Sequence, residues 1–423
     1  MKMKRGQKTQ HLKKAFLFTY FAFMTIILSL SVLGVKLDVS KLNIFSHTRD
    51  VEMVNSPEHT QEELVFQPFD VERYRKEHGT ADQASEAEVI SESDDLADSE
   101  NSVSQNDRDA RKKFIIGGWI PQWDFNSGLF AVQNHEAFNE VSPVWYHLNN
   151  DGSLIINRPA RYVDLMELRL TGDLKVIPTV ACFDADIMHS VLSSDVNRDR
   201  QIDEIMYEVT TYDYDGIDLD YEQIYDKDKV AFFEFLTLLS DRLHDENKIL
   251  SVTVLPKWGD KIIYSSSPQT RSVQDWGRIA QLADEVRIMA YDFTVTSDPE
   301  AGPITPKEWL KKIIDYAKEE IPEDKIIVGL PLYAYEWGSD GRRNVYTYGE
   351  LQGVLGADIE NNYHTALGES MAIYKCADSV QCTVYYQSKE ALGDKVDIVK
   401  KSGVAGVYFW RLGGEGDLFT GLL

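Results

Sequence analysis

The chain has 423 residues, of which 43% are apolar, enough to build one large domain with appendages or two medium domains. Its formal net charge of −25 argues against nucleic acid as a partner, because binding phosphates requires a concentrated basic surface. The overall composition is typical of a soluble globular protein.

The N-terminal 35 residues carry the signals of membrane insertion. Residues 15–35 are uncharged and mostly apolar over about the length that a helix needs to cross a bilayer. Residues 1–14 form a basic tail, and cationic flanks stay in the cytoplasm, so we expect a single-pass segment that delivers everything after Lys36 to the far side. A signal-anchor is favoured because the apolar run is long and no A-x-A site follows it; cleavage as a signal peptide near Val32-Leu33-Gly34 is the alternative.

Residues 36–113 are predicted to be a largely disordered acidic linker. From Gln83 to Asp109 the chain is rich in Ser, Glu, Asp, Asn and Ala and contains no aromatic residue. Such a segment cannot bury enough apolar surface to offset its ordering entropy, and its charges repel one another and extend it. We interpret it as a spacer between the membrane and the following domain; an adhesive acidic tail is the functional alternative.

From Phe114 onwards, short apolar runs alternate with amphipathic stretches, as in folds that build a parallel sheet from alternating strands and helices. Eight runs qualify as strands: 114–120, 142–148, 174–181, 214–219, 250–255, 285–290, 325–332 and 404–410. Apolar residues recur every three or four positions, as in helices, at 200–211, 227–247, 275–283 and 306–320. The repeats predict an α/β fold, a (β/α)₈ TIM barrel over residues 114–423, with its site at the C-terminal ends of the strands.

Two features break the regular repeat. The interval between the seventh and eighth strands is far longer than one helix, and hairpin-like alternation from Met371 to Tyr386 predicts a small α+β insertion at about 336–387. The chain also ends so soon after Trp410 that residues 418–423 form at most a stunted eighth helix. We therefore expect another segment to cover that flank of the barrel.

Three cysteines allow one disulfide. Cys376 and Cys382 flank the tip of the predicted hairpin, and in an exported chain a disulfide between them is favoured over two free thiols. Cys182 has no evident partner and is interpreted as a packing residue at a strand end rather than a nucleophile. No C-x-x-C or H-E-x-x-H spacing occurs, so nothing in the sequence indicates a structural or catalytic zinc.

The most informative stretch is DGIDLDYE at residues 215–222, which places three carboxylates two residues apart behind an apolar lead-in. A strand sends alternate side chains to the same face, so the carboxylates of Asp218, Asp220 and Glu222 share one small space. Because like charges so close cannot all ionise, at least one proton is retained near neutral pH, and Glu222, the outermost, becomes a candidate general acid. An acidic strand end facing water and a cation site are the alternatives.

This run resembles the D-G-x-D-x-D-x-E signature of the family 18 glycoside hydrolases, the chitinases and their relatives, and the match is complete. The sequence MAYD at residues 289–292 looks like the M-x-Y-D motif of the same family, and Trp410 ends a late apolar run as the family's pocket-floor tryptophan does. The resemblance covers about residues 114–423. Within the family, GLPLYAYEW at residues 329–337 is most similar to the bacterial branch that includes spore-cortex and peptidoglycan glucosaminidases.

The resemblance implies retaining hydrolysis of a β-linked glycan that contains N-acetylglucosamine, without a cofactor or metal. Glu222 would protonate the departing glycosidic oxygen, and Asp220 would bind the N–H of the substrate's acetamido group while sharing a proton with Asp218. Tyr291 would orient the acetamido oxygen, which itself attacks the anomeric carbon in this family. Asp215 would have a structural role at the start of the strand.

The resemblance and the predicted strand ends also indicate substrate-binding residues. Asp292 would bind sugar hydroxyls, and Trp410 would stack its flat apolar face on a sugar ring. Met289, Tyr333 and Trp119 are further candidates. Of the aromatic residues only Trp410 has the motif position, and the others are equally well explained as core residues.

Peptidoglycan is the first substrate expected and chitin oligomers the second, for an outward-facing monomer tethered to a bacterial cell membrane, or secreted if the N-terminal segment is cleaved. A catalytically silent, lectin-like barrel that binds glycans is the rival hypothesis. The intact acids favour hydrolysis, because a protein that only binds has no need to keep Glu222. The sequence leaves open whether cleavage is endo or exo.

Overall fold

The structure is a computed structural model that describes residues 113–423, except residues 160, 260, 261, 263, 265, 361, 378 and 423. The predicted basic tail 1–14, the membrane segment 15–35 and the linker up to residue 112 lie outside the described residues. Within the described part, no helix combines the length and the apolar character that crossing a membrane requires.

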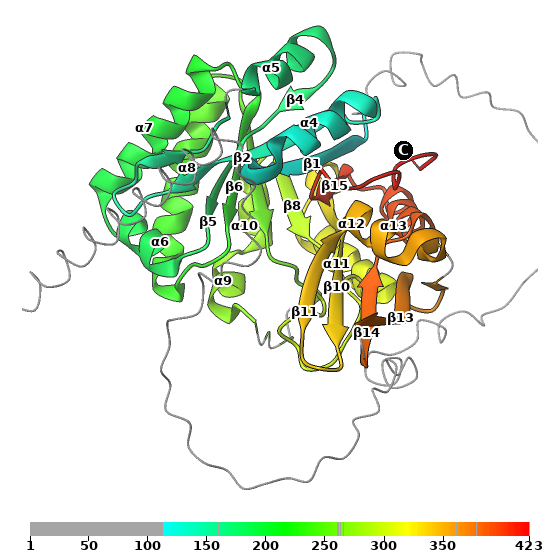
Figure 1. Cartoon of the computed structure of the whole chain (residues 1–423). Helices are drawn as coiled ribbons and strands as arrows, with labels where there is room; N and C mark the ends of the chain where they lie inside the picture. Colours follow the sequence, from blue (N-terminus) through cyan, green and yellow to red (C-terminus); the bar gives the residue numbers. More distant parts are fainter. Residues whose placement is uncertain are drawn as a thin grey trace, which may run out of the picture. The chain divides into compact units, whose positions relative to one another are not determined.

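Eight parallel strands close into a barrel (Figure 1). Around the ring they are β1 (Ile115–Pro121), β2 (Glu140–Leu148), β5 (Thr179–Cys182), β6 (Gly216–Tyr221), β7 (Ile249–Val254), β8 (Glu285–Met289), β9 (Ile326–Pro331) and β15 (Gly406–Trp410). The ring is closed because β1 pairs in parallel with both β15 and β2. Two short strands, β3 (Leu154–Ile156) and β4 (Lys175–Val176), also pair with β2. The predicted barrel is confirmed; only its third strand, 174–181, is divided, into β4 and β5.

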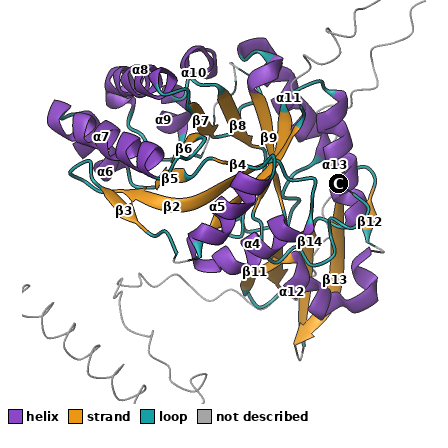
Figure 2. Ribbon diagram, turned by 90° about the horizontal axis from the view of Figure 1, so that it is seen from above, coloured by secondary structure: helices purple, strands orange, loops and turns teal. Residues whose placement is uncertain are grey.

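Helices enclose the barrel (Figure 2). They are α4 (Phe125–Asn134), α5 (Tyr162–Thr171), α6 (Ala185–Leu192), α7 (Asp195–Thr211), α8 (Lys229–Asp245), α9 (Pro268–Val273), α10 (Trp276–Leu282), α11 (Lys307–Glu320) and α13 (Lys389–Lys401). Short 3-10 helices lie at Gln122–Asp124, Asp226–Asp228, Glu323–Lys325 and Gly356–Glu360. The four predicted helices are confirmed as α7, α8, α10 and α11.

The two faces of each barrel strand have different environments, and β6 shows why this positions a site. Its outward side chains, Ile217, Leu219 and Tyr221, are buried in the apolar core beneath the helices. The period of two in a strand then turns Asp218 and Asp220 toward the barrel axis. Burial of the apolar face therefore fixes the direction of the carboxylates.

Between β9 and α13 the chain forms a separate antiparallel sheet of five strands, which we call the lobe (residues 333–386). Its strands, in spatial order, are β11 (Arg343–Thr347), β10 (Tyr333–Gly338), β14 (Val380–Tyr386), β13 (Glu369–Ala377) and β12 (Tyr363–His364), accompanied by helix α12 (Tyr348–Leu355). Figure 1 shows the lobe at one side of the barrel, in yellow to orange. The predicted insertion is present, but it begins at Tyr333, almost directly after β9.

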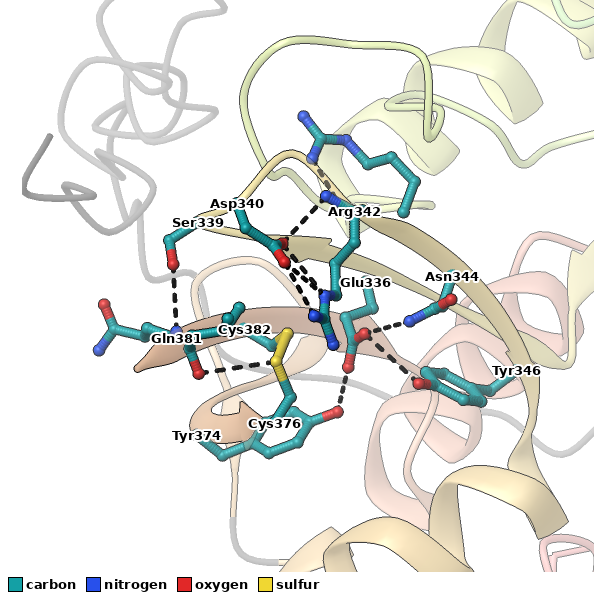
Figure 3. Close-up of a disulfide and its surroundings, with 12 residues drawn as sticks. Glu336, Ser339, Asp340, Arg342, Asn344, Tyr346, Tyr374, Cys376, Gln381 and Cys382 are labelled. Atoms are coloured by element: carbon teal, nitrogen blue, oxygen red, sulfur yellow. Dashed lines mark hydrogen bonds and ion pairs between the residues drawn. A yellow bond between two sulfur atoms is a disulfide. The ribbon is translucent and has the colours of Figure 1, made fainter. Parts of the chain in front are cut away.

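A disulfide and a buried carboxylate hold the lobe together (Figure 3). Cys376 and Cys382 are bonded across the β13–β14 hairpin, with an S–S distance of 1.99 Å. On β10, the buried Glu336 accepts hydrogen bonds from Tyr374 of β13 and, at 2.6 Å, from Asn344 of β11. The carboxylate thus ties β10, which also faces the barrel, to strands of the lobe on both sides.

After β15 the described residues form turns and no helix, which leaves a gap in the ring of helices. Leu418 and Phe419 are buried there. The ring of Phe419 lies 5.4 Å from that of Phe138 and 5.1 Å from that of Phe409, measured between centroids. The C-terminal turns therefore cover the flank that an eighth helix would occupy.

Candidate active site

The predicted carboxylate run lies on β6 and points into the barrel. Asp218 is fully buried, with an exposure of 0%. Asp220 lies one pleat nearer the C-terminal end of the strand, between Ala181 of β5 and Thr253 of β7. Glu222 follows directly after the strand. The three acids therefore form a column from the barrel interior to its mouth.

Asp218 is enclosed by hydroxyl and indole donors. One carboxylate oxygen, Oδ2, accepts hydrogen bonds from Trp119 Nε1 at 3.1 Å and Thr179 Oγ1 at 2.9 Å. The other, Oδ1, accepts from Ser251 Oγ at 2.8 Å and Thr253 Oγ1 at 3.0 Å. No hydrogen bond links Asp218 to Asp220 in the described part of the chain. Both oxygens are thus satisfied without a shared proton, and sharing between the two acids stays a prediction.

A buried charge cluster that the sequence analysis missed lies beneath the acids. Arg287 of β8 is fully buried and contacts Glu140 at 2.8 Å, Glu285 at 2.9 Å and Asp218 at 3.5 Å. Its guanidinium also lies 4.2 Å from the ring centroid of Tyr408. Burial raises the pKa of Glu140 to about 8, and the charge of Glu285 adds to the effect. Arg287 therefore contacts three acids at the base of the site, and Lys175 lies 3.8 Å from one of them, Glu140.

The two outer acids hold their protons more tightly than free carboxyls do. Burial raises the pKa of Asp220 well above its usual value, and the charges of Glu222 and Asp218 raise it further. Burial, with the charge of Asp292, raises the pKa of Glu222 from 4.5 to about 7. Asp220 Oδ1 is buried and has no hydrogen-bond partner among the described residues. It is therefore an acceptor available to a bound ligand.

Tyr291 and Asp292 follow β8 and meet the lobe. Burial raises the pKa of the Tyr291 phenol well above its ordinary value, so it is a neutral donor. The backbone of Asp292 has a φ of 63°, a left-handed conformation that Asp tolerates better than most residues. Its Oδ1 accepts hydrogen bonds from the phenols of Tyr333 and, at 2.9 Å, of Tyr335. Both tyrosines belong to β10, so the lobe supplies part of the site.

A cavity of about 470 Å³ joins these groups at the barrel mouth, a size typical of small-molecule sites. Seven of the predicted catalytic and substrate-binding residues line it: Trp119, Asp220, Glu222, Met289, Tyr291, Asp292 and Trp410. Trp119 is only 2% exposed and packs edge-on to Trp410, with 6.2 Å between ring centroids. Most of the Trp119 ring therefore belongs to the core and supports the Trp410 ring.

A second hollow of about 320 Å³ adjoins the cavity, and the two share Asp292 and Trp410. It is lined by Tyr333 and Tyr335 of the lobe and by Trp123, which is 67% exposed. Tyr333, predicted as a substrate-binding residue, lines this hollow and not the cavity. The two hollows therefore meet at Asp292 and Trp410 and together form one groove.

Two further residues singled out from the sequence, Asp215 and Cys182, do not line the cavity. Asp215 lies at the start of β6, where it accepts hydrogen bonds from Arg169 Nε at 2.7 Å and the backbone N–H of Val176 at 2.8 Å. Cys182 is buried at the end of β5, and burial raises the pKa of its thiol to about 11. A thiol with so high a pKa is protonated at neutral pH and is a poor nucleophile.

Residues 137–415 match the glycosyl hydrolases family 18, and because this match covers most of the chain, the protein belongs to that family of glycosidases. Among curated proteins it is similar to the uncharacterized glycosylase YvbX of Bacillus subtilis, with 22% identity over 293 residues, 67% of this chain and 83% of that protein. It is also similar to the cortical fragment-lytic enzyme of the same species, with 23% identity over 295 residues, 66% of this chain and 67% of that enzyme. The crystal structure of a chitinase from Chromobacterium violaceum has the same fold, with a TM-score of 0.64 and 22% identity over 73% of this chain and 96% of that one.

Proposed function

We propose that this glycosidase cleaves β-linked glycans containing N-acetylglucosamine with retention, by substrate-assisted catalysis. The observation that carries the proposal is the pairing of Asp220 and Glu222 in one cavity, both with raised pKa values, beside the exposed face of Trp410. A raised pKa keeps a carboxyl protonated where a general acid must work, close to neutral pH.

The first step breaks the glycosidic bond. The carboxyl of Glu222 donates its proton to the leaving oxygen while the carbonyl oxygen of the substrate's acetamido group attacks the anomeric carbon. The buried Oδ1 of Asp220 accepts the acetamido N–H, and the phenol of Tyr291 donates to the acetamido oxygen. The positive charge of the cyclic intermediate is then stabilised by the column of acids beneath it.

The second step restores the enzyme. The carboxylate of Glu222 takes a proton from a water molecule, which attacks the anomeric carbon from the side that the leaving group vacated. The ring of the intermediate opens, the acetamido group is regenerated, and the sugar keeps its β configuration. Two displacements on the same carbon account for retention.

The other carboxylates are badly placed to act as the nucleophile of an ordinary retaining glycosidase. Asp218 lies fully buried beneath the cavity and is enclosed by donors. Asp292 already accepts two phenol hydrogen bonds at Oδ1. The acetamido oxygen of the substrate is therefore the nucleophile that fits the cavity best.

Peptidoglycan is the proposed substrate, with chitin oligomers second. The names of two relatives support these two candidates without ranking them, since one is a cortical fragment-lytic enzyme and another a chitinase. The groove formed by the two hollows has room for more than one sugar. We further propose that the N-terminal segment tethers the enzyme to the outer face of the membrane; a protease added to intact cells that cannot reach the C-terminal domain would contradict this topology.

The test is incubation of the full chain, purified in detergent, with chitin oligomers and purified cell-wall glycan. Mass analysis should find products with N-acetylglucosamine at the new reducing end, and NMR should detect the β anomer first. Oligomers without acetyl groups should not be cleaved. Initial formation of the α anomer would refute retention, and cleavage of deacetylated oligomers would refute assistance by the substrate.

Glu222→Gln should abolish turnover and leave oligomer binding largely intact, because the amide keeps the shape of the side chain but has no acidic proton. Glu136→Gln, the same change at an exposed position, is the matched control and should behave as wild type. Equal activity of Glu222→Gln and wild type would remove Glu222 from the mechanism. Binding without turnover in the wild-type protein would support the rival hypothesis of a silent glycan-binding barrel.

A further inference from the structure

One cationic side chain and three acidic ones line the described part of the cavity. Arg271 of α9 is 8% exposed and is the one lysine or arginine among the described residues of the cavity lining. Three carboxylates share the same lining: Asp220, Glu222 and Asp292. Their contacts, described above, do not include Arg271.

Arg271 is held by neutral groups only. Its Nε donates to the carbonyl oxygen of Pro256 at 3.0 Å, and its Nη1 donates to the carbonyl oxygen and, at 3.0 Å, to the hydroxyl of Ser266. No carboxylate of the described residues forms an ion pair with it, and within the described ranges its hydrogen bonds come from Nε and Nη1, not from Nη2. Burying a charge without a counter-ion destabilises a fold, so a carboxylate brought by a ligand would stabilise Arg271.

The position of Arg271 indicates which part of a substrate it meets. Helix α9 is fastened to the segment around the general acid, because Thr270 Oγ1 accepts the backbone N–H of Ile224 at 3.0 Å and Gln274 Nε2 donates to the carbonyl oxygen of Tyr221 at 3.2 Å. Trp410, by contrast, ends β15, three strands away around the ring from β7, which precedes α9. A sugar on Trp410 therefore places the leaving group, beyond the general acid, toward Arg271.

We propose that Arg271 binds a carboxylate carried by the leaving-group sugar, which makes an acidic glycan the preferred substrate. This inference rests on the proposed function and deepens it. A chain in which N-acetylglucosamine alternates with its 3-O-lactyl derivative, as in peptidoglycan, carries that charge, whereas chitin does not. The carboxylate belongs either to the lactyl group itself or, where a peptide is attached there, to the peptide.

A second cation distinguishes these two sources. Lys257 lines a hollow of about 440 Å³ that adjoins the cavity at Arg271. Burial lowers the pKa of Lys257 to about 8, against the opposing effect of Asp275 and Glu320, whose carboxylates line the same hollow. Its Nζ donates to the carbonyl oxygen of Gln274, and no carboxylate of the described residues is in ion-pair contact with it. A lactyl carboxylate would reach Arg271 alone, while a longer peptide would extend to Lys257.

The test compares kcat/KM of the full chain on four tetrasaccharides. One is the chitin tetramer, and the other three alternate N-acetylglucosamine with its lactyl derivative, bearing a free lactyl carboxylate, its methyl ester or an attached peptide. The wild-type protein should prefer the free acid over the ester. Arg271→Gln, which can still bond to the backbone carbonyls, should lower kcat/KM on the acid by about 10- to 100-fold more than on the chitin tetramer, the range of an ionic hydrogen bond. Arg271→Lys should keep part of the preference.

The outcomes separate the inference from the proposed function. Equal loss on the acid and on the chitin tetramer in Arg271→Gln would show a structural role and overturn the inference. If that variant does not fold, the comparison of acid with ester on the wild-type protein decides in its place. Loss on the peptide substrate in Lys257→Gln identifies the peptide as the source of the carboxylate. A wild-type protein that cleaves chitin but ignores the acid overturns this inference alone, whereas one that cleaves neither overturns the proposed function as well.

Discussion

Glu222→Gln should make the protein more stable above neutral pH while it removes activity. In the fold, the pKa of Glu222 is about 7, above its ordinary 4.5. Between these two pH values the folded state binds more protons at Glu222 than the unfolded state does, so the free energy of unfolding falls as pH rises. The loss is absent below about pH 4.5 and complete once pH has risen through the folded pKa near 7.

The size of the effect follows from the two pKa values. A difference of one pKa unit corresponds to about 1.4 kcal/mol, so the charged carboxylate should cost the fold about 3 kcal/mol at pH 8. The amide of glutamine does not ionise and avoids this cost. For a domain of this size, a gain of that magnitude should raise the midpoint of thermal unfolding by about 5 °C.

The assay is thermal and urea unfolding of the wild-type protein, Glu222→Gln and Glu136→Gln at pH 5 and pH 8. The three proteins should unfold at similar midpoints at pH 5, and only Glu222→Gln should gain at pH 8. The activity of the wild-type protein should fall over the same pH range, because the general acid loses its proton there. Equal differences at both pH values, or a variant less stable than wild type at pH 8, would refute the reasoning.

Two further substitutions test the surroundings of the acids. Arg287→Met should destabilise the barrel by about 3–5 kcal/mol, because it removes the buried cation that contacts three carboxylates. In urea unfolding, the loss of stability should be smaller at pH 5 than at pH 8. A loss of stability that does not depend on pH would contradict the pairing of Arg287 with these carboxylates. Tyr335→Phe removes a phenol that holds down the pKa of Asp292, so less charge remains there to raise the pKa of the general acid. The alkaline limb of the pH–rate profile should therefore move to lower pH by a few tenths of a unit, and a shift to higher pH would count against this coupling.

Local patterns were sufficient to predict the barrel and the acids. The strands of the barrel alternate with amphipathic helices, and each apolar run is long enough to be recognised as a strand from the sequence. On β6 the alternation of Ile217, Asp218, Leu219 and Asp220 indicates which face packs in the apolar core and which face carries the acids. A strand pattern of this kind needs no knowledge of distant partners.

The rest of the site depends on contacts that a linear pattern does not encode. Arg287 meets Glu140, which is 147 positions away, only because β8 and β2 lie on one closed ring. The alternation Glu285, Arg287, Met289 on the strand of the M-x-Y-D motif does show that these side chains face the barrel axis, but not what they meet. Tyr335 reaches Asp292 across 43 positions, through a lobe whose register the sequence leaves open.

The contact between the lobe and Asp292 bears on how this enzyme can be redesigned. Asp292 of the barrel receives both of its phenol donors from the lobe, so the lobe is part of the active site. Replacing the lobe with the lobe of another chitinase-like protein, in order to widen or narrow the groove, would also change the pH range in which the enzyme works. A replacement that keeps both Tyr333 and Tyr335 would avoid this change.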